Sequence, residues 1–432
     1  MSPREYLLSL EQIGIKLGLE QIRALVAELG HPDAAYKSII IAGTNGKGSV
    51  TAMIERGLRA AGYRTGRYTS PHLVDIEERF AIDGQQISAQ QLDEVGARVR
   101  EAARALPHPP SFFEATTALA LEVFRDEHVD VAVLEVGLGG RLDATNVVTP
   151  VGVAITAIDI DHEQYLGSTI EQIAGEKAGV IKPGALVVLG ANPPAAERVV
   201  RDAATRAGAF LVHATKDEGV SMSWKMNEGR ARLSLITPRR TYPPLTLALR
   251  GRHQVENAVT AVRLLEELSA REVFEVPESA VIEGLTRVEW PARLEHVTWR
   301  GRTVVIDGAH NPAGARALAS YLSETYGRRV PMVVGIMRDK KIDEMIEALA
   351  PVASYFVFTA ASSGRAASPA ELAAVARRVA PAVPYSESVS PIDALDAAAV
   401  HGDPIVVAGS LYLAGEVRYS STTPPMPPAA DV

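Results

Sequence analysis

The sequence has no cysteine in its 432 residues, so disulfide bonds, thiolate metal sites and cysteine nucleophiles are excluded. It also has no apolar run that approaches the length needed to cross a bilayer. The first residues, MSPREYLLSLEQ, mix charged with apolar side chains and lack the apolar core of a signal peptide. These absences predict a protein without a membrane partner and, by default, a cytoplasmic one.

Acidic side chains outnumber basic ones, with 52 Asp and Glu against 44 Lys and Arg, so the formal net charge is −8, and no stretch forms a concentrated basic patch. Nucleic acid is therefore not an expected partner. Hydrophobic residues make up 47% of the chain and charged residues 22%, which is the balance of an ordinary globular enzyme. An acidic protein that binds anionic ligands must gather its lysines and arginines locally, and the motifs below do so.

The alternation of short β-branched runs with helical patterns predicts an α/β fold. Between residues 37 and 193 the runs are almost continuously apolar, as expected for strands buried on both faces of a sheet. These runs are SIIIAG, VDVAVLEVG, VGVAITAI and ALVVLGA. The region is predicted to be a P-loop-type, mostly parallel sheet with helices on both faces.

The rest of the chain divides into a meander and a second α/β series. Residues 212–249 have the pattern of meander strands with a turn at 227–229, and a helical pattern covers 256–270. A second alternating series starts near Trp299 and predicts a smaller, Rossmann-like domain. The expected domains are 1–292 and 293–419, followed by a disordered tail at 420–432.

The stretch IIIAGTNGKGSV has the character of a phosphate-binding loop but departs from the usual spacing. Only two residues separate Gly43 from Gly46-Lys47, where the usual pattern has four, and a further glycine precedes Ser49. The stretch nevertheless joins a predicted strand to a predicted helix N-terminus, where backbone N–H groups favour a phosphate. Lys47 can reach the β- and γ-phosphates of a nucleotide, and the Ser49 hydroxyl can bind Mg²⁺. A purely structural glycine-rich turn is the less favoured alternative.

A second glycine-rich stretch, EVGLGGRLDATN, partly matches a dinucleotide-binding fingerprint. Leu142 occupies its third glycine position, and Arg141 and Asp143 interrupt the apolar start of the expected helix, so we reject an NAD site. Glu135 ends the preceding predicted strand, 129–136, where a buried carboxylate is costly. It is either a salt-bridged strand terminus or a ligand of Mg²⁺.

Two features follow the predicted strand at 151–158. Asp161 and His162 lie beyond its carboxyl end, where open α/β sheets bind their ligands. Ser168 and Glu171 are predicted to form the capping box of the next helix.

Lys177 falls on the predicted buried face of that helix, with Ile170, Ile173 and Ala174 at helical spacing. A lysine that points inward usually snorkels to solvent or pairs with an acid. A buried amine can also lose its proton and become chemically available. The periodicity leaves both alternatives open.

In the second series, VVIDGAHNPAGA places Asp307 at the end of a strand, with His310 and Asn311 before a helix that opens at Pro312. Asp307 and His310 are either turn and cap residues or ligand contacts. Two polar side chains at the carboxyl end of one strand favour ligand contact.

Taken together, and in this order along the chain, the motifs resemble those of one family. They are GTNGKGS, TSPHL, FFEATT, EVGLGGRLDATN, DH, EKAG, GRHQVENA, WPAR, DGAHNP, DK and GSLY. They are similar to those of the folylpolyglutamate synthases and dihydrofolate synthases, within the Mur ligase superfamily, and they cover nearly the whole chain.

The resemblance implies an ATP-dependent ligase that joins L-glutamate to dihydropteroate, to tetrahydrofolate polyglutamates, or to both. The implied route passes through an acyl phosphate and releases ADP and phosphate. It requires ATP and Mg²⁺, with two metal ions expected. We expect a monomer whose partners are its small-molecule substrates alone.

The resemblance also implies roles for the matching residues. The nucleotide would be held by Gly43, Thr44, Asn45, Gly46, Lys47, Gly48, Ser49, Asn257, Arg293 and Asp307. Mg²⁺ would be ligated by Ser49, Ser70, Glu135, His162 and Lys177, the last in a carbamylated form that relatives carry fifteen residues after the motif histidine. The pterin would be held by Leu17, Gly18, Leu19, Glu20, Phe113, Glu114, Ala115 and Thr116, and Ser410 would lie near the glutamate. Catalytic roles would fall to Lys47, His162, Lys177 and His310.

Two positions depart from the family pattern. Relatives usually have glycine where this chain has Ala292, and alanine fits there unless the backbone φ is positive. Relatives also have an acidic residue where this chain has Lys341, which reverses one charge.

Three other functions compete with the folate ligase. A peptidoglycan-precursor ligase of the same superfamily would share the loop, the glutamate, the histidine and the lysine, but it would not need FFEATT or TSPHL. A small-molecule kinase would transfer phosphate without needing L-glutamate. A non-catalytic nucleotide-binding regulator would tolerate loss of Glu135, His162 or Lys177, all of which are present. The folate ligase ranks first, and the sequence leaves open which of its two activities dominates.

Overall fold

The computed structural model describes residues 1–14 and 16–422, which fold into two compact units. Unit 1 comprises Met1–Lys225, Arg232–Ala248 and Gln254–Glu289, and unit 2 comprises Met226–Ala231, Leu249–His253 and the chain from Trp290 onward. Unit 2 therefore includes two short segments, together with residues 290–292, that the sequence placed in the 1–292 domain.

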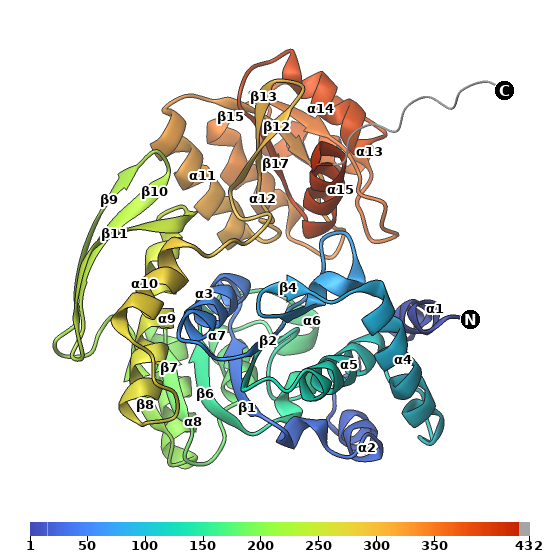
Figure 1. The fold of residues 1–432 in the computed structure, drawn as a ribbon. Helices are drawn as coiled ribbons and strands as arrows, with labels where there is room; N and C mark the ends of the chain where they lie inside the picture. The colour runs from blue at the N-terminus through green and yellow to red at the C-terminus, as the bar shows by residue number, and fades with distance from the viewer. Residues whose placement is uncertain (15, 423–432) are drawn as a thin grey trace. The chain divides into compact units, whose positions relative to one another are not determined.

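The elements before residue 290 alternate as the sequence predicts, and Figure 1 labels many of them. The helices are α1 (Pro3–Ser9), η1 (Leu10–Ile13), α2 (Glu20–Glu28), η2 (Pro32–Ala34), α3 (Lys47–Ala60), η3 (Ile76–Arg79), α4 (Ala89–Arg104), α5 (Phe112–Asp126), η4 (Ala144–Val147), α6 (Glu163–Leu166), α7 (Ile170–Ala178), α8 (Pro194–Arg206), α9 (His253–Ala270) and α10 (Glu278–Thr286). The strands are β1 (Lys37–Ala42), β2 (Thr65–Tyr68), β3 (Phe80–Ile82), β4 (Gln85–Gln86), β5 (Val131–Glu135), β6 (Pro150–Ile155), β7 (Leu186–Leu189), β8 (Phe210–His213), β9 (Ser221–Asn227), β10 (Arg230–Ile236) and β11 (Thr241–Arg250).

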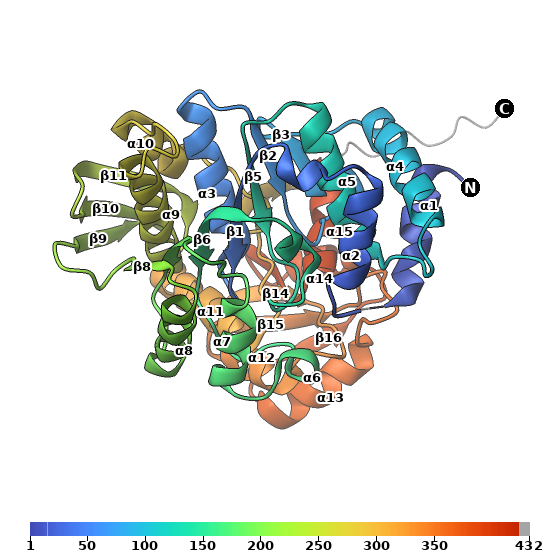
Figure 2. The same ribbon diagram turned by 90° about the horizontal axis from the view of Figure 1, so that it is seen from below.

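Unit 1 is built around an eight-stranded sheet in the order β4-β3-β2-β5-β1-β6-β7-β8. From β2 to β8 all neighbouring strands are parallel, while β3 and β4 extend one edge in antiparallel pairing. Figure 2 shows α3 and α9 on one side of the sheet and α2 and α5 on the other. The predicted mostly parallel sheet with helices on both faces is confirmed. β8 belongs to this sheet, although the sequence placed its residue 212 in the meander.

The central strands are buried on both faces, which explains why their sequences do not alternate. Ile40 of β1 packs in a core with Leu25 of α2 and Phe124 of α5. Gly152 of β6 faces α9, where an added Cβ would lie 3.1 Å from Leu264 Cδ1. Neither face meets water, so every position along these strands favours an apolar residue.

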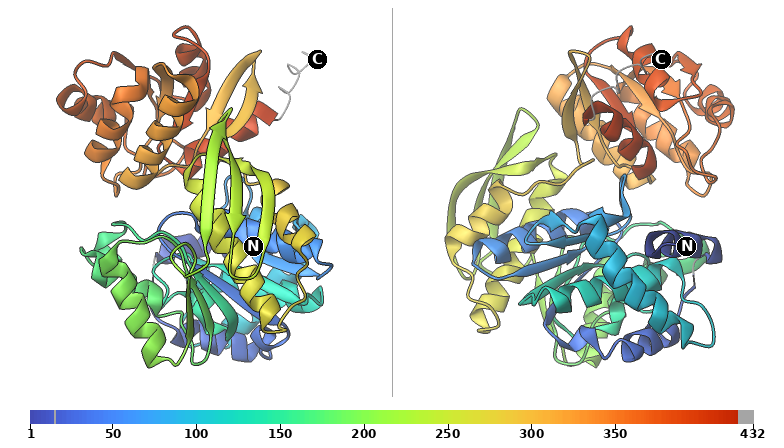
Figure 3. Two further views of the ribbon diagram at one scale, coloured as in Figure 1. Left: turned by 90° about the vertical axis from the view of Figure 1, so that its left-hand side faces the viewer. Right: turned by 45° about the vertical axis from the view of Figure 1, so that its right-hand side comes forward.

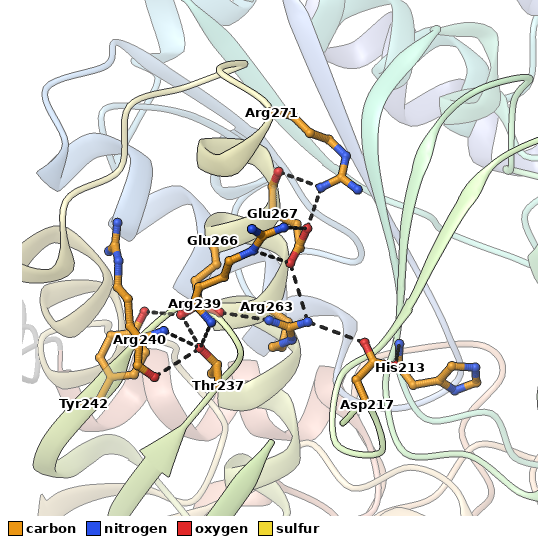
Figure 4. Close-up of polar contacts among 10 residues, drawn as sticks. All are labelled: His213, Asp217, Thr237, Arg239, Arg240, Tyr242, Arg263, Glu266, Glu267 and Arg271. Atoms are coloured by element: carbon orange, nitrogen blue, oxygen red, sulfur yellow. Dashed lines mark hydrogen bonds and ion pairs between the residues drawn. The ribbon is translucent and has the colours of Figure 1, made fainter. Parts of the chain in front are cut away.

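The strands β9, β10 and β11 form a separate three-stranded sheet in the order β11-β10-β9, seen in Figure 3. The turn between β9 and β10 lies at residues 228–229, as predicted. Within unit 1, the connection between β10 and β11 is tied to α9 by a cluster of charged and hydroxyl side chains, shown in Figure 4.

Arg263 of α9 lies at the centre of this cluster and is 2% exposed. Its guanidinium is 3.2 Å from a Glu266 oxygen, 3.5 Å from Glu267 and 3.5 Å from Asp217. The other side chains that bind Glu266 and Glu267 belong to Thr237, Arg239, Tyr242 and Arg271, while the backbone N–H of His213 donates to Asp217. The buried carboxylates of Glu266 and Glu267 therefore have cationic or hydroxyl partners, as buried charges require.

Unit 2 is a smaller α/β domain, as predicted. Its elements are β12 (Glu295–Trp299), β13 (Arg302–Ile306), α11 (Pro312–Tyr326), β14 (Val330–Val334), α12 (Ile342–Leu349), η5 (Ala350–Val352), β15 (Ala353–Phe358), α13 (Pro369–Val379), β16 (Tyr385–Glu387), α14 (Pro391–Ala399), β17 (Ile405–Ala408) and α15 (Leu411–Thr422). The sheet has the order β12-β13-β17-β14-β15-β16, and only the edge strand β12 pairs antiparallel within it.

Helix α15 continues to Thr422, so residues 420–422 are helical and the expected tail does not begin at residue 420. Residues 423–432 of that expected tail lie outside the described residues. In the part of the chain that the structure describes, no helix has the length and apolar character needed to cross a membrane.

Candidate active site

The carboxyl ends of β5, β1 and β6 lie side by side, so the loops that follow them meet at one edge of the sheet. The predicted phosphate loop leaves β1 and enters α3 at Lys47. The backbone N–H groups of Thr44 and Asn45 donate to Ala157 O at 2.8 and 3.2 Å. Thr156 Oγ1 donates to Asn45 O at 2.8 Å. These bonds fix the loop against the end of β6.

Two glycines of the loop are required by its packing. At Gly43, φ is +147° and a Cβ would lie 1.9 Å from Thr156 Oγ1. At Gly46, φ is +89° and a Cβ would lie 2.4 Å from Asn257 Oδ1. Both positions therefore exclude a side chain. Gly46 leads directly into the N-terminus of α3, a position that favours a phosphate.

Lys47 and Lys177 reach the loop from different helices. Lys47 Nζ donates to Gly43 O at 3.1 Å, and Lys177 Nζ donates to the same oxygen at 2.8 Å. Lys177 is 3% exposed, which confirms that it lies on the buried face of α7. Burial and then the charge of Lys47 lower the pKa of Lys177 to about 7, while Asp161 and Asp143 oppose the shift. Lys177 therefore does not snorkel to solvent but ends at a backbone carbonyl of the loop.

Two of the predicted metal ligands, Glu135 and His162, lie at or beyond the carboxyl ends of strands that end at the same edge of the sheet. Glu135 ends β5, is 6% exposed and accepts a hydrogen bond from Ser70 N at 3.3 Å. His162 has a left-handed backbone with φ +53°, and its Nε2 lies 3.9 Å from Asp161 Oδ2. Among the described residues, no three His, Cys, Asp or Glu side chains form a group that could hold a metal ion. A cation here would therefore need serine or nucleotide oxygens as further ligands.

The first turn of α9 supplies two amide side chains to the loop. Gln254 Nε2 donates to Ser49 Oγ at 3.2 Å, and Gln254 Oε1 accepts from Asn257 Nδ2 at 2.9 Å. All three residues are buried. The sequence assigned Asn257 but missed Gln254. The available signal was the spacing of three residues, which puts both amides on one face of a helix.

The capping box of α7 differs from the prediction. Thr169 and Gln172 form it, and not Ser168 and Glu171. Thr169 has an extended backbone and is the last non-helical residue, so its hydroxyl accepts from Gln172 N at 3.3 Å. Ser168 donates its backbone N–H to Gln172 Oε1 at 2.9 Å instead.

In the two segments that were expected to hold a pterin, most side chains face the protein. Ala115 and Thr116 have no exposed surface. Glu114 accepts hydrogen bonds at 2.7 Å from the backbone N–H and the hydroxyl of Ser111, so it caps α5. Phe113 is partly exposed and its ring lies 5.9 Å from that of Tyr68. Phe113 is therefore the member of its segment whose side chain is not fully enclosed by the protein.

In the other segment, Gly18 donates its N–H to Leu142 O at 3.4 Å, and Leu19 is buried. Leu17 and Glu20 are exposed, the latter at the start of α2. The side chains of Leu17 and Glu20 are thus open to solvent, whereas Leu19 contributes to the core.

In unit 2 the structure brings Asp307 and Arg293 together. Asp307 follows β13, is 8% exposed and accepts the N–H groups of Leu294 and Ala309, both at 2.9 Å. Burial raises the pKa of Asp307, while Arg293 and the two backbone bonds oppose the shift.

Arg293 lies in a loop with strained backbone. Ala292 has φ +54° and Leu294 has φ +49°. Arg293 Nη1 donates to Ala292 O at 2.9 Å, and Gly308 N donates to the same oxygen at 2.8 Å. Ala292 is thus in the conformation that glycine would adopt without strain.

The other predicted residues of unit 2 occupy the starts of helices. Asn311 is the N-cap of α11, and His310 Nδ1 lies 2.8 Å from Gly308 O. Ser410 is 1% exposed, and its hydroxyl accepts from Leu413 N at 3.0 Å at the start of α15. Capping accounts for Asn311 and Ser410, whereas His310 remains partly exposed.

Sequence comparison matches both units to known families. A family model described as the Mur ligase middle domain matches residues 41–265, and one described as the Mur ligase, glutamate ligase domain, matches residues 292–411. The chain is 35% identical over 361 residues to a Bacillus subtilis protein named dihydrofolate synthase/folylpolyglutamate synthase. The match covers 82% of this chain and 84% of that protein.

Solved structures share the whole fold. Mycobacterium tuberculosis folylpolyglutamate synthase complexed with ADP is similar with a TM-score of 0.89 and 35% identity, over 98% of this chain and 100% of that one. Escherichia coli FolC in complex with DHPP and ADP is similar with a TM-score of 0.85 and 29% identity, over 97% of each chain.

Proposed function

Because the chain belongs to the Mur ligase family, in the branch of the folylpolyglutamate and dihydrofolate synthases, we propose that it carries both activities of that branch. The chain is an ATP-dependent ligase that joins L-glutamate to folates. The proposed substrates are dihydropteroate for the first glutamate and tetrahydrofolates for later ones. The observation that carries the proposal is similarity over 82% of this chain to a protein whose name gives both activities.

The loop from Gly43 to Ser49 is the proposed site of the ATP phosphates. Its support is the strand-to-helix geometry and the two glycines that close packing requires. Lys47 would exchange its hydrogen bonds to two loop carbonyls, Gly43 O and Thr44 O, for bonds to β- and γ-phosphate oxygens. Asn257, Arg293 and Asp307 would contact the rest of the nucleotide.

Two Mg²⁺ ions are proposed, with ligands Ser49, Ser70, Glu135, His162 and a carbamylated Lys177. The donor set fits, because the buried Ser49 hydroxyl and Glu135 carboxylate are hard oxygen ligands close to the end of the sheet. When bound, Mg²⁺ would neutralise charge on the transferred phosphoryl group.

Carbamylation of Lys177 would replace a buried cation with a buried anion. The neutral amine attacks CO₂, an N–C bond forms and one proton is released. The product keeps one N–H, so the bond to Gly43 O can persist. After incubation with isotopically labelled bicarbonate, NMR should detect a carbamate carbon in the wild type and none in Lys177→Arg. An unmodified Lys177 in active enzyme would contradict the assignment.

Catalysis would proceed in two displacements. The folate carboxylate attacks the γ-phosphorus of ATP, and ADP leaves. The amine of L-glutamate then attacks the acyl carbon, an amide bond forms and phosphate leaves with loss of one proton. Lys47 and Arg293 would supply positive charge to the moving phosphoryl group, and His310 would lie close to the reacting carboxylate.

The test is phosphate release with ATP, Mg²⁺ and L-glutamate, run in parallel with dihydropteroate and with tetrahydrofolate. We expect L-glutamate-dependent turnover with both substrates. Turnover with only one would reduce the proposal to that activity, and phosphate release that does not require L-glutamate would contradict ligation. Light scattering of the same sample tests the expected monomer, and fractionation of cells tests the expected cytoplasmic location.

A further inference from the structure

The strained loop around Arg293 is held by a carboxylate outside the predicted site. Glu295, the first residue of β12, accepts the backbone N–H of Ala292 through Oε2 at 2.9 Å. Arg418 of α15 holds the same carboxylate, with Nε at 3.0 Å from Oε1 and 3.2 Å from Oε2. The loop is therefore linked through Glu295 to a helix that lies 123 residues further along the chain.

The carboxylates of Glu295 and Asp307 both bind the backbone of the loop around Arg293. Glu295 binds the N–H of Ala292, and Asp307 binds the N–H of Leu294. These are the two residues with left-handed backbone, one on each side of Arg293. A left-handed backbone is unfavourable for residues other than glycine. It persists only where contacts with the surrounding structure hold the residue in that conformation. The two carboxylates supply that constraint.

The constraint sets the direction of the Arg293 side chain. The backbone conformations of Ala292 and Leu294 set the direction in which the side chain of Arg293 leaves the loop. That direction is kept only while both residues remain left-handed. The guanidinium is then closed in by Gly308, where a Cβ would lie 2.4 Å from Arg293 Nη1. Release of the Ala292 N–H would free one side of the loop and let Arg293 take other directions.

We propose that Glu295, held by Arg418, is a positioning residue that fixes Arg293 in the direction required for the nucleotide. The inference rests on the proposed function, in which Arg293 contacts ATP. It assigns no contact with the nucleotide to Glu295 or Arg418 themselves.

The test is a double-mutant cycle on ADP affinity, measured by isothermal titration. Glu295→Ala should weaken ADP binding about tenfold, which corresponds to about 1.4 kcal/mol for the lost constraint. Glu295→Gln should weaken it less, because an amide oxygen still accepts the N–H of Ala292. In an Arg293→Ala background, Glu295→Ala should cause no further loss, because the residue through which it acts is gone.

The matched control is Asp343→Asn, which disrupts an ion pair of similar length in the same unit, with Arg378 Nη2 2.8 Å from Asp343 Oδ2. It should leave ADP affinity unchanged. In steady-state assays, Glu295→Gln and Arg418→Met should raise the KM for ATP and leave the KM for L-glutamate unchanged. If Glu295→Ala does not fold, the Glu295→Gln cycle carries the same test.

Unchanged ADP affinity in the Glu295 variants would overturn the inference. A tenfold loss of ADP affinity on adding Glu295→Ala to the Arg293→Ala variant would also overturn it, because Glu295 would then affect ADP binding without acting through Arg293. If Arg293→Ala alone binds ADP with wild-type affinity, Arg293 does not contact the nucleotide, and the inference fails. The ligase activity is tested separately, because turnover by the wild-type enzyme would still support it.

Discussion

At the scale of single residues, Ala292 is a non-glycine residue with a strained, left-handed backbone. Its φ of +54° is favourable only for glycine. We predict that Ala292→Gly raises the free energy of unfolding by about 0.5–1 kcal/mol, because the strain relieved exceeds the flexibility gained by the unfolded chain. The measurement is denaturant unfolding of the full chain.

The matched control for this prediction is Ala317→Gly in the middle of α11, which should lower the free energy of unfolding by about 1 kcal/mol. The two substitutions are chemically identical and should differ in sign. A loss of similar size at both positions would show that residue 292 is not strained in solution.

His253, the first residue of α9, predicts a dependence of stability on pH. Burial and then Arg293 lower its pKa to about 4, whereas in the unfolded chain it has its ordinary value of about 6.5. Between these values the unfolded state binds more protons, so the stability present above pH ~6.5 is lost as the pH falls towards ~4.

The contribution of His253 reaches about 3 kcal/mol at full loss, from about 2.5 pKa units at 1.36 kcal/mol each. Denaturant unfolding at several pH values between 7 and 4 should show a shallower decline for His253→Gln than for the wild type. His108→Gln, at an exposed histidine, should leave the decline unchanged. Equal slopes for the wild type and His253→Gln would contradict the assignment.

At the scale of elements, α9 joins two regions of unit 1 that are far apart in sequence. Its first turn holds the phosphate loop through Gln254 and Asn257, and its middle is fixed by the buried cluster around Arg263 (Figure 4). A helix is stiff along its axis, so an anchor in its middle also fixes its first turn. The position of the two amides at the loop therefore depends on the charged cluster.

We predict that Arg263→Met lowers the free energy of unfolding by about 3 kcal/mol, because it leaves buried carboxylates with one cation fewer. The loss lies at the low end of the range for a broken buried pair, since Glu267 keeps Arg239 and Arg271. Denaturant unfolding measures it. Arg104→Met, which breaks an exposed pair with Glu101 in α4, should cost less than about 1 kcal/mol. Similar losses in both variants would mean that burial adds nothing to the cluster.

At the scale of the whole molecule, nucleotide binding should stabilise the folded chain by mass action. ADP with Mg²⁺ at one hundred times its dissociation constant should add about 2.7 kcal/mol to the free energy of unfolding. The midpoint of thermal unfolding should rise accordingly in the wild type. Lys47→Ala should show a much smaller rise at the same ADP concentration. An equal rise in that variant would place the nucleotide away from the loop.

The sequence alone determined the order and type of most elements, the glycine-rich loop that joins β1 to α3, Glu135 at its strand end and the buried face that carries Lys177. These features depend on local spacing: apolar periodicity, the residues that start and end helices, and glycines next to a lysine. The capping box of α7 was wrong by one residue, because neighbouring residues offered equivalent hydroxyl and acid or amide pairs and only the backbone conformation distinguishes them.

The tertiary structure alone decided which distant residues meet. Gln254 binds Ser49 across 205 positions, and Arg418 holds Glu295 across 123. It also decided that Ala292 is left-handed, since φ there follows from the hydrogen bonds that Glu295 and Gly308 make with its backbone. Contacts of this kind depend on how elements pack, and packing depends on all residues of a unit at once, so no local pattern encodes them.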